Sequence, residues 1–173
     1  NAIVDEGARF AENGVAPLNR SGDEEGCHWS ATGVTTPAGY KEAYRQYVEN
    51  GWPALSAGVE YGGQGMPNML GIIANELAGT ANWSWVMYPG LSHGAVNTVE
   101  AHGDADQKRK YLTKLVSGEW TGTMCLTESQ CGSDLGLLRT RAELQADGSY
   151  AITGTKIFIS AGEHDMTTNI VHI

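Results

Sequence analysis

The chain has 173 residues, 41% hydrophobic and 18% charged, a composition typical of a globular protein of one domain, or of one domain and part of another. Its formal net charge of -9 argues against non-specific nucleic-acid binding and against docking on anionic membranes. No apolar run approaches the roughly 20 residues of a membrane-spanning helix, and the sequence shows no signal-peptide pattern.

The cysteines Cys27, Cys125 and Cys131 are odd in number and show no Cys-x-x-Cys spacing, so neither a disulfide framework nor a zinc site is predicted. The five histidines are scattered, and we expect no metal site. Because reduced cysteines are typical of the cytosol, we expect a cytoplasmic protein. The sequence starts at Asn1 rather than Met, so the natural chain is expected to begin earlier.

The first 38 residues carry weak structural signals. A short helix is expected within residues 1–12, where Phe10 stands among small and acidic residues. Residues 13–38 are rich in Gly, Pro, Ser and Thr and are predicted to be irregular.

Residues 39–50 are predicted to form a helix that ends at Gly51. Its apolar side chains recur at helical spacing: Tyr40, Tyr44, Tyr47 and Val48. Glu42 and Glu49 each lie one turn from Arg45, so both can pair with it.

The segment 55–67 contains the run Tyr61-Gly-Gly-Gln-Gly65. Glycines in this density suggest a phosphate cradle, but no Lys-Ser/Thr pair follows and no βαβ strand precedes them, which disfavours a P-loop. We interpret these glycines as positions where the backbone turns sharply.

Two further helices are predicted in the middle of the chain. The first begins near Asn68 and places apolar residues on one stripe: Met69, Ile72, Ile73 and Leu77. The second spans about residues 83–102 and is apolar over much of its surface, which indicates a central, buried helix. Its Gly90 and Gly94 allow the close approach either of a neighbouring helix or of a ligand, and both alternatives stay open.

A third helix is predicted over residues 105–116, where Asp104 and Gln107 form a capping-box pattern. Strands are then predicted over residues 120–127, 137–144 and 150–153. The Asp147-Gly148 pair between the last two is a hairpin signal. A further apolar, strand-like run closes the sequence, so the sheet is expected to be unfinished.

The stretch 124–134 reads Met-Cys-Leu-Thr-Glu-Ser-Gln-Cys-Gly-Ser-Asp and joins the end of a predicted strand to a polar loop. Such a rim presents backbone N–H groups and hydroxyls, which suits a phosphate or the polar edge of a planar cofactor. An ordinary polar loop between two strands is the alternative, and the residues of this stretch alone favour it.

The stretch 152–162 reads Ile-Thr-Gly-Thr-Lys-Ile-Phe-Ile-Ser-Ala-Gly. On a strand, Ile157 and Ile159 would point to one side, and Phe158 and Ser160 to the other. A ring and a hydroxyl on one face make a place where a flat polar ring can lie. A half-buried strand with a core Phe is the alternative.

The pattern Leu-Thr-Glu-x-x-x-Gly-Ser-Asp at 126–134, followed by Gly-Thr-Lys-Ile-Phe-Ile-Ser at 154–160, resembles the middle domain of the flavin-dependent acyl-CoA dehydrogenase family in order and spacing. The Tyr-Gly-Gly-x-Gly run is similar to the loop that enters a core helix in this family. Residues 131–140, Cys-Gly-Ser-Asp-Leu-Gly-Leu-Leu-Arg-Thr, resemble the larger bacterial members of the methylmercaptopropionyl-CoA dehydrogenase type.

The resemblance covers nearly the whole chain and implies an α+β fold. It implies an N-terminal α-helical domain over residues 1–119 and the first part of a middle, flavin-binding antiparallel β-domain over residues 120–173. The C-terminal helical bundle that completes the family's fold is expected to be absent from this chain.

The resemblance also implies that the full-length protein binds FAD non-covalently. The cofactor-binding residues that it implies are Met124, Leu126, Thr127, Gly132, Ser133, Phe158, Ile159 and Ser160. Backbone at Met124 and Leu126 and the Thr127 side chain would meet the pyrimidine edge of the flavin.

The remaining contacts are implied in the same way. Gly132 and Ser133 would meet the pyrophosphate, and Ser133 would also touch the acyl-CoA. Phe158 would pack on the isoalloxazine, with Ser160 near its redox-active nitrogen. Phe158 stands where the family usually has Trp, and Ser160 where it usually has Thr.

The implied activity is α,β-dehydrogenation of an acyl-CoA thioester to the enoyl-CoA, in fatty acid metabolism. Electron-transfer flavoprotein is the implied acceptor and a homo-oligomer the implied state of the full-length protein. No catalytic residue is assigned in this chain, because the family's base lies in the C-terminal helical domain. Glu128 is interpreted as a structural residue of its loop, and the 173-residue chain alone is expected to be inactive.

Two other classes stay open. The first is a flavin-dependent acyl-CoA oxidase or monooxygenase of the same fold, which passes electrons to oxygen; reoxidation of the substrate-reduced enzyme by air would identify it. The second is a non-catalytic acyl-CoA-binding or protein-binding module, which a missing downstream carboxylate would indicate.

Overall fold

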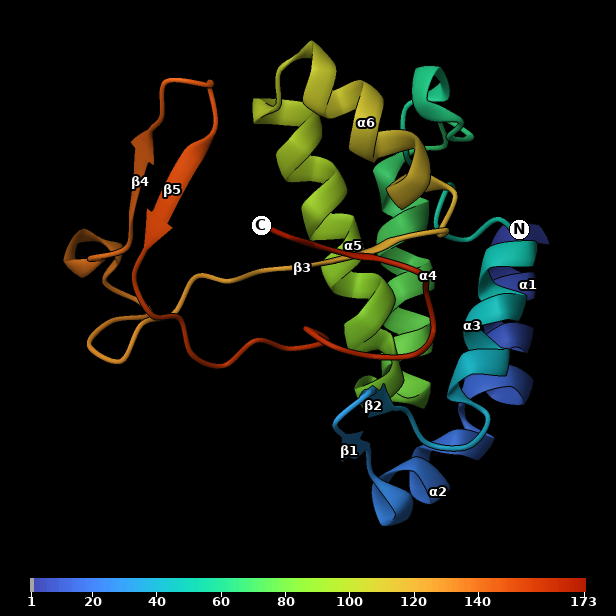
Figure 1. Cartoon of the computed structure of the whole chain (residues 1–173). Helices are drawn as coiled ribbons and strands as arrows, with labels where there is room; N and C mark the ends of the chain where they lie inside the picture. The colour runs from blue at the N-terminus through green and yellow to red at the C-terminus, as the bar shows by residue number, and fades with distance from the viewer. Residues whose placement is uncertain (1) are drawn as a thin grey trace.

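A computed structural model describes residues 2–173 as a helical body with three pairs of short strands, one of which crosses it (Figure 1). The helices are α1 Ala2–Phe10, α2 Pro17–Glu25, α3 Tyr40–Glu49, α4 Asn68–Ala81, α5 Trp83–His102 and α6 Ala105–Val116. The strands are β1 His28–Ser30, β2 Gly33–Thr35, β3 Thr121–Thr123, β4 Arg141–Leu144, β5 Tyr150–Thr153 and β6 Ile170–His172. Helices followed by strand pairs confirm the α+β class.

The strands form three separate pairs. β1 pairs with β2 and β4 with β5, both antiparallel, whereas β3 and β6 are parallel, with Thr121 opposite Ile170. The β4–β5 hairpin turns at the predicted Asp147-Gly148 pair, where Gly148 has a φ of 83°. In Figure 1 this hairpin stands away from the helical body, while β3 runs across α5.

The predicted central helix is confirmed as α5. Its buried residues are Trp85, Val86, Pro89, Ser92, Ala95, Val96 and Val99. Asn82 caps its first turn by accepting a hydrogen bond from the Trp85 amide. Gly90 faces α4, because a Cβ at this position would lie 3.6 Å from Oδ1 of Asn75, whereas Gly94 meets nothing within 4 Å. The Gly90 contact is therefore one between neighbouring helices.

β3 lies directly on α5 and positions the chain that follows it. The Gly122 amide donates to Oγ of Ser92 at 3.0 Å. A Cβ at Gly122 would lie only 2.3 Å from Cβ of Ala95, so glycine is needed where strand and helix touch. The residues of β3 are fully buried, and the stretch that begins at Met124 emerges from this contact.

The local signals of α3 and α6 are confirmed. Arg45 pairs with both Glu42 and Glu49 on α3. Asp104 and Gln107 form the capping box at the start of α6. These ion pairs are half-exposed, so each adds little to stability.

The prediction that residues 13–38 are irregular is wrong, because they include α2 and the β1–β2 hairpin. Pro17 stands in the first turn of α2, where its missing N–H costs no helical hydrogen bond. Gly22 is a packing residue rather than a breaker, because a Cβ there would lie 2.5 Å from Oη of Tyr40. Glycine thus lets α2 approach α3, while the helix expected within residues 1–12 is confirmed as α1.

The apolar stripe predicted for α4 is only partly buried. Met69 and Ile72 are 63% and 61% exposed, while Ile73 and Leu77 are half-buried. α4 contacts α1 and α5, and its one buried residue is the small Ala78. The face of α4 that packs against its neighbours therefore carries smaller side chains than the apolar periodicity predicted.

The predicted strands 120–127 and 137–144 are shorter than expected, since β3 ends at Thr123 and β4 begins at Arg141. The single-turn 3-10 helix Leu135–Leu137 stands in place of the start of the second strand. Among residues 2–173, none of the helices combines the length and apolarity that crossing a bilayer requires.

Candidate functional site

The two polar stretches singled out in the sequence lie side by side. The Ile157 amide donates to the Thr127 carbonyl at 2.9 Å, and Nζ of Lys156 donates to the Leu126 carbonyl at 3.0 Å. Oγ1 of Thr123 donates to the Ser160 carbonyl. We call residues 123–134 and 156–160 the paired segments; contacts between residues about 30 positions apart bring them together.

The paired segments carry exposed apolar side chains at their surface. Met124 is 53% exposed, Ile159 42% and Phe158 85%. Thr127 and Gly132 lie close to each other, because a Cβ at Gly132 would be 3.3 Å from Cγ2 of Thr127. The remaining candidates are half-buried Leu126 and exposed Ser133 and Ser160.

The strand predicted through Lys156–Ser160 is wrong. These residues belong to no strand, and Phe158 has a φ of 56°, in the left-handed region that few residues other than glycine adopt. The expected alternation, with Phe158 and Ser160 on one side and two isoleucines on the other, therefore does not apply. Ala161 has a φ of 53° as well, so the turn after Ser160 is also left-handed.

Glu128 is held from all sides, as expected of a structural residue. Its carboxylate accepts hydrogen bonds from the amides of Arg139 and Thr140 at 2.8 and 2.9 Å, from Nε2 of Gln130 at 2.6 Å and from Nζ of Lys156 at 2.9 Å. The Thr140 side chain, the Arg139 amide and the Lys156 ammonium hold the pKa of Glu128 well below its usual range. Glu128 is therefore ionised and fully engaged.

A buried histidine ties β3 to residues 164–169, which the sequence did not indicate. Nδ1 of His164 accepts a hydrogen bond from the Met166 amide at 3.2 Å, so its proton is on Nε2, which lies 2.9 Å from Oγ1 of Thr121. Oγ1 of Thr121 lies 3.1 Å from Oγ1 of Thr167, which donates to the Asn169 carbonyl. This proton order requires a neutral imidazole.

Acidification is expected to destabilise the protein through buried His164 and half-buried His93. Burial lowers the pKa of His164, outweighing Asp165 and Glu163, and burial also lowers the pKa of His93. Near pH 6 these histidines therefore bind more protons in the unfolded chain than in the folded protein. Their contribution to the free energy of unfolding is fully present above the unfolded pKa of about 6.5, and it is lost as the pH falls toward their lower pKa in the folded state.

The measurement is urea unfolding at pH 7.5 and pH 5.5, a window above the range in which carboxylates titrate. His164→Gln should lower stability at pH 7.5 and flatten its pH dependence. His102→Gln, at an exposed position, is the matched control and should keep the wild-type slope. If the free energy of unfolding of His164→Gln depended on pH as in the wild type, His164 would not be a source of the acid destabilisation.

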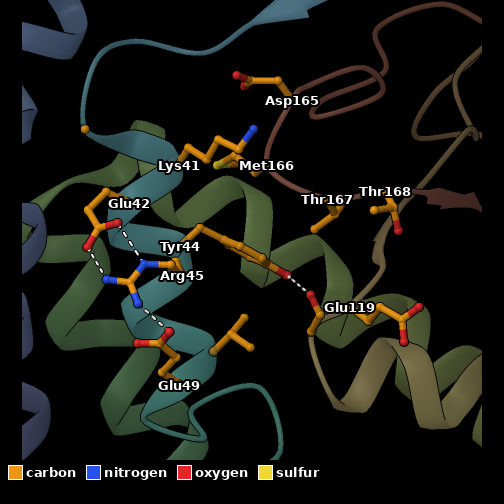
Figure 2. Close-up of a pocket in the computed structure, with 13 residues that line it drawn as sticks. Lys41, Glu42, Tyr44, Arg45, Glu49, Glu119, Asp165, Met166, Thr167 and Thr168 are labelled. Carbon is orange, nitrogen blue, oxygen red and sulfur yellow. Dashed lines mark hydrogen bonds and ion pairs between the residues drawn. The ribbon is translucent and has the colours of Figure 1, made fainter.

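A cavity of about 860 Å³ lies away from the paired segments, between α3 and residues 118–119 and 165–168 (Figure 2). Figure 2 shows Arg45 between Glu42 and Glu49, with Glu119 and Asp165 across the cavity. Four carboxylates outnumber the two cations of this lining, Lys41 and Arg45. Its electrostatics therefore disfavour a pyrophosphate, and the cavity is not a candidate site for a nucleotide cofactor.

Residues 1–119 match the family described as acyl-CoA dehydrogenase, N-terminal domain. The chain is 46% identical over 172 residues to 3-methylmercaptopropionyl-CoA dehydrogenase of Ruegeria pomeroyi, covering 99% of this chain and 29% of that protein. It is 32% identical over 177 residues to a butyryl-CoA dehydrogenase of Syntrophomonas wolfei, covering 100% and 29%. The chain thus spans 29% of the length of these curated relatives.

Solved structures of acyl-CoA dehydrogenases are similar to this chain as well. Butyryl-CoA dehydrogenase from Megasphaera elsdenii superposes with a TM-score of 0.79 at 25% identity, over 93% of this chain and 40% of that chain. An acyl-CoA dehydrogenase from Bacillus anthracis complexed with FAD superposes with a TM-score of 0.74 at 25% identity, over 91% and 25%. The resemblance drawn from the two motifs is confirmed, and the chain belongs to the acyl-CoA dehydrogenase family.

Proposed function

We propose that the protein binds FAD at the paired segments and dehydrogenates an acyl-CoA thioester between its α and β carbons. The observation that carries this proposal is the meeting of the two motifs, with the Phe158 ring 85% exposed beside them. An aromatic ring left open to solvent on a backbone with positive φ suits a flat ligand that covers it. The structure with FAD from Bacillus anthracis supports this choice of cofactor.

The proposed contacts are those of the two motifs. The residues that would hold FAD are Met124, Leu126, Thr127, Gly132, Ser133, Phe158, Ile159 and Ser160. Met124, Leu126 and Thr127 follow β3 directly and present backbone and a hydroxyl to the flavin edge, and Gly132 and Ser133 supply amides for the pyrophosphate. Ser133 is also proposed to touch the acyl-CoA. When bound, FAD supplies the two-electron oxidation, and the protein positions it and excludes water.

We assign no catalytic base among residues 1–173. A general base needs a pKa near the working pH and free access to its proton. Glu128 meets neither condition, because it is 4% exposed, hydrogen-bonded by four donors and held ionised by them. Its role is therefore proposed to be structural, and the base is proposed to lie outside this chain.

The same proposal includes the division of the chain and its partners. Residues 1–119 form the helical domain, and residues 120–173 contribute to the flavin-binding β-domain. The acyl-CoA is the substrate and an electron-transfer flavoprotein the acceptor, in a cytoplasmic homo-oligomer. A structural match with a TM-score of 0.77 and 26% identity, whose description names the electron transferring flavoprotein of Acidaminococcus fermentans, supports the acceptor.

The test uses the purified full-length protein. It is expected to be yellow, to release FAD on denaturation, and to lose its flavin absorbance when mixed anaerobically with butyryl-, isovaleryl- or methylmercaptopropionyl-CoA. Slow reoxidation by air would support a dehydrogenase, and fast reoxidation an oxidase. A colourless protein that gains no flavin absorbance with added FAD would contradict the proposal.

A further inference from the structure

One carboxylate in the proposed site joins three separate parts of the chain. Oε1 of Glu128 meets Nζ of Lys156 at 2.9 Å and the Thr140 amide at 2.9 Å, and Oε2 meets the Arg139 amide at 2.8 Å. The side chain of Glu128 is 3% exposed and that of Lys156 21%. Nζ of Lys156 reaches across to the other segment twice, because it also donates to the Leu126 carbonyl at 3.0 Å.

The segment 156–160, which carries Phe158, makes two other hydrogen bonds to residues 123–134. Between the paired segments, the bonds seen among the described residues besides those of Lys156 are Ile157 N–H to the Thr127 carbonyl and Thr123 Oγ1 to the Ser160 carbonyl. Lys156 stands two residues before Phe158, which has a strained φ of 56°. Lys156 therefore supplies two of the four hydrogen bonds that hold the Phe158 segment against residues 123–134.

From this geometry, we propose that Glu128 and Lys156 act as a clamp that sets the position of Phe158 relative to residues 124–127. Both are positioning residues, which act on the flavin through the segments that they join. The inference rests on the proposed function for its consequence, which is flavin affinity. Its geometric part, the joining of the paired segments, stands without the cofactor.

The clamp predicts an ordered series of variants in the full-length protein. Lys156→Met keeps the length of the side chain, removes both of its hydrogen bonds and leaves the Glu128 carboxylate without its cation. We expect the FAD dissociation constant to rise at least tenfold and the visible circular dichroism of the residual bound flavin to change. Lys156→Arg keeps the charge and the donors and should recover most of the affinity.

The matched control is Lys114→Met, which breaks the 2.7 Å ion pair with Glu119 on the helical body, away from the paired segments. It should leave the FAD dissociation constant and the flavin dichroism unchanged. The unfolding midpoint of Lys156→Met is measured beside its FAD affinity, which separates loss of folding from loss of the clamp.

A second readout needs no flavin. In the apoprotein, hydrogen exchange at the Ile157 amide, which bonds to Thr127, should become at least tenfold faster in Lys156→Met while exchange in α5 is unchanged. Wild-type exchange at Ile157 in Lys156→Met would overturn the clamp, as would wild-type FAD affinity accompanied only by a lower unfolding midpoint. A wild-type protein that binds no FAD would refute the proposed function, while the exchange experiment would still decide the clamp.

Discussion

Trp85→Ala is expected to lower the free energy of unfolding by about 3–5 kcal/mol, the range for deleting a large aromatic side chain from a well-packed core. Trp85 is 0% exposed, and its ring packs edge-on against Phe10, at 5.8 Å between centroids, and Tyr47, at 5.5 Å. Its Nε1 donates to the Tyr40 carbonyl at 3.2 Å, so truncation also removes a buried hydrogen bond between α5 and α3. Three helices that meet at this ring would lose contact together.

Urea unfolding of the full-length protein, followed by near-ultraviolet circular dichroism, measures this loss. The matched control is Trp29→Ala, because Trp29 is 81% exposed in the β1–β2 hairpin and its removal should change stability by no more than about 0.5 kcal/mol. Similar losses in the two variants would show that Trp85 does not anchor the core.

Phe158→Ala is expected to weaken FAD binding by about 1–3 kcal/mol, or roughly 5- to 150-fold, the range for a ring stacked on an aromatic side chain. The ring is 85% exposed, so its removal takes little from the folded state, and unfolding of the apoprotein should be unchanged. Phe158→Trp retains a larger ring and should bind FAD at least as tightly as the wild type.

The dissociation constant for FAD, measured by flavin fluorescence in the full-length protein, provides the test. Ile152→Ala removes another exposed apolar side chain, 75% exposed on β5, and serves as the control with wild-type affinity expected. If Phe158→Ala and Ile152→Ala bind FAD equally well, the ring faces solvent rather than the cofactor.

The helices that sequence reasoning predicted well have signals that lie within a few residues of each other. The capping box of Asp104 and Gln107 and the pairing of Arg45 with both of its neighbouring glutamates are such local signals. α2 was missed because the signal at Gly22 is not local. Gly22 is required by its close contact with Tyr40 on another helix. The amino-acid sequence by itself does not distinguish a glycine required by such a contact from a glycine required by a turn.

The candidate site also has features that the sequence predicted and others that it did not. Its motifs identified which stretches to pair, because their residue types and order were informative before any contact was known. The contacts that hold them, Lys156 to Glu128 and His164 to Thr121, join residues far apart in the chain and carry no pattern. The left-handed backbone at Phe158 was also beyond prediction, since only tertiary contacts hold a non-glycine residue there.

The parallel pairing of β3 with β6 has a consequence for the order of folding. α4 and α5 are separated by Asn82 alone, so their contact closes only a short loop. The pairing of β3 with β6 closes a long loop, which includes the β4–β5 hairpin. Closing so long a loop costs chain entropy before any contact repays it. We therefore expect the α4–α5 pair to form before the β3–β6 pair, so that α5 is already a surface when the segments proposed to hold the cofactor pack onto it.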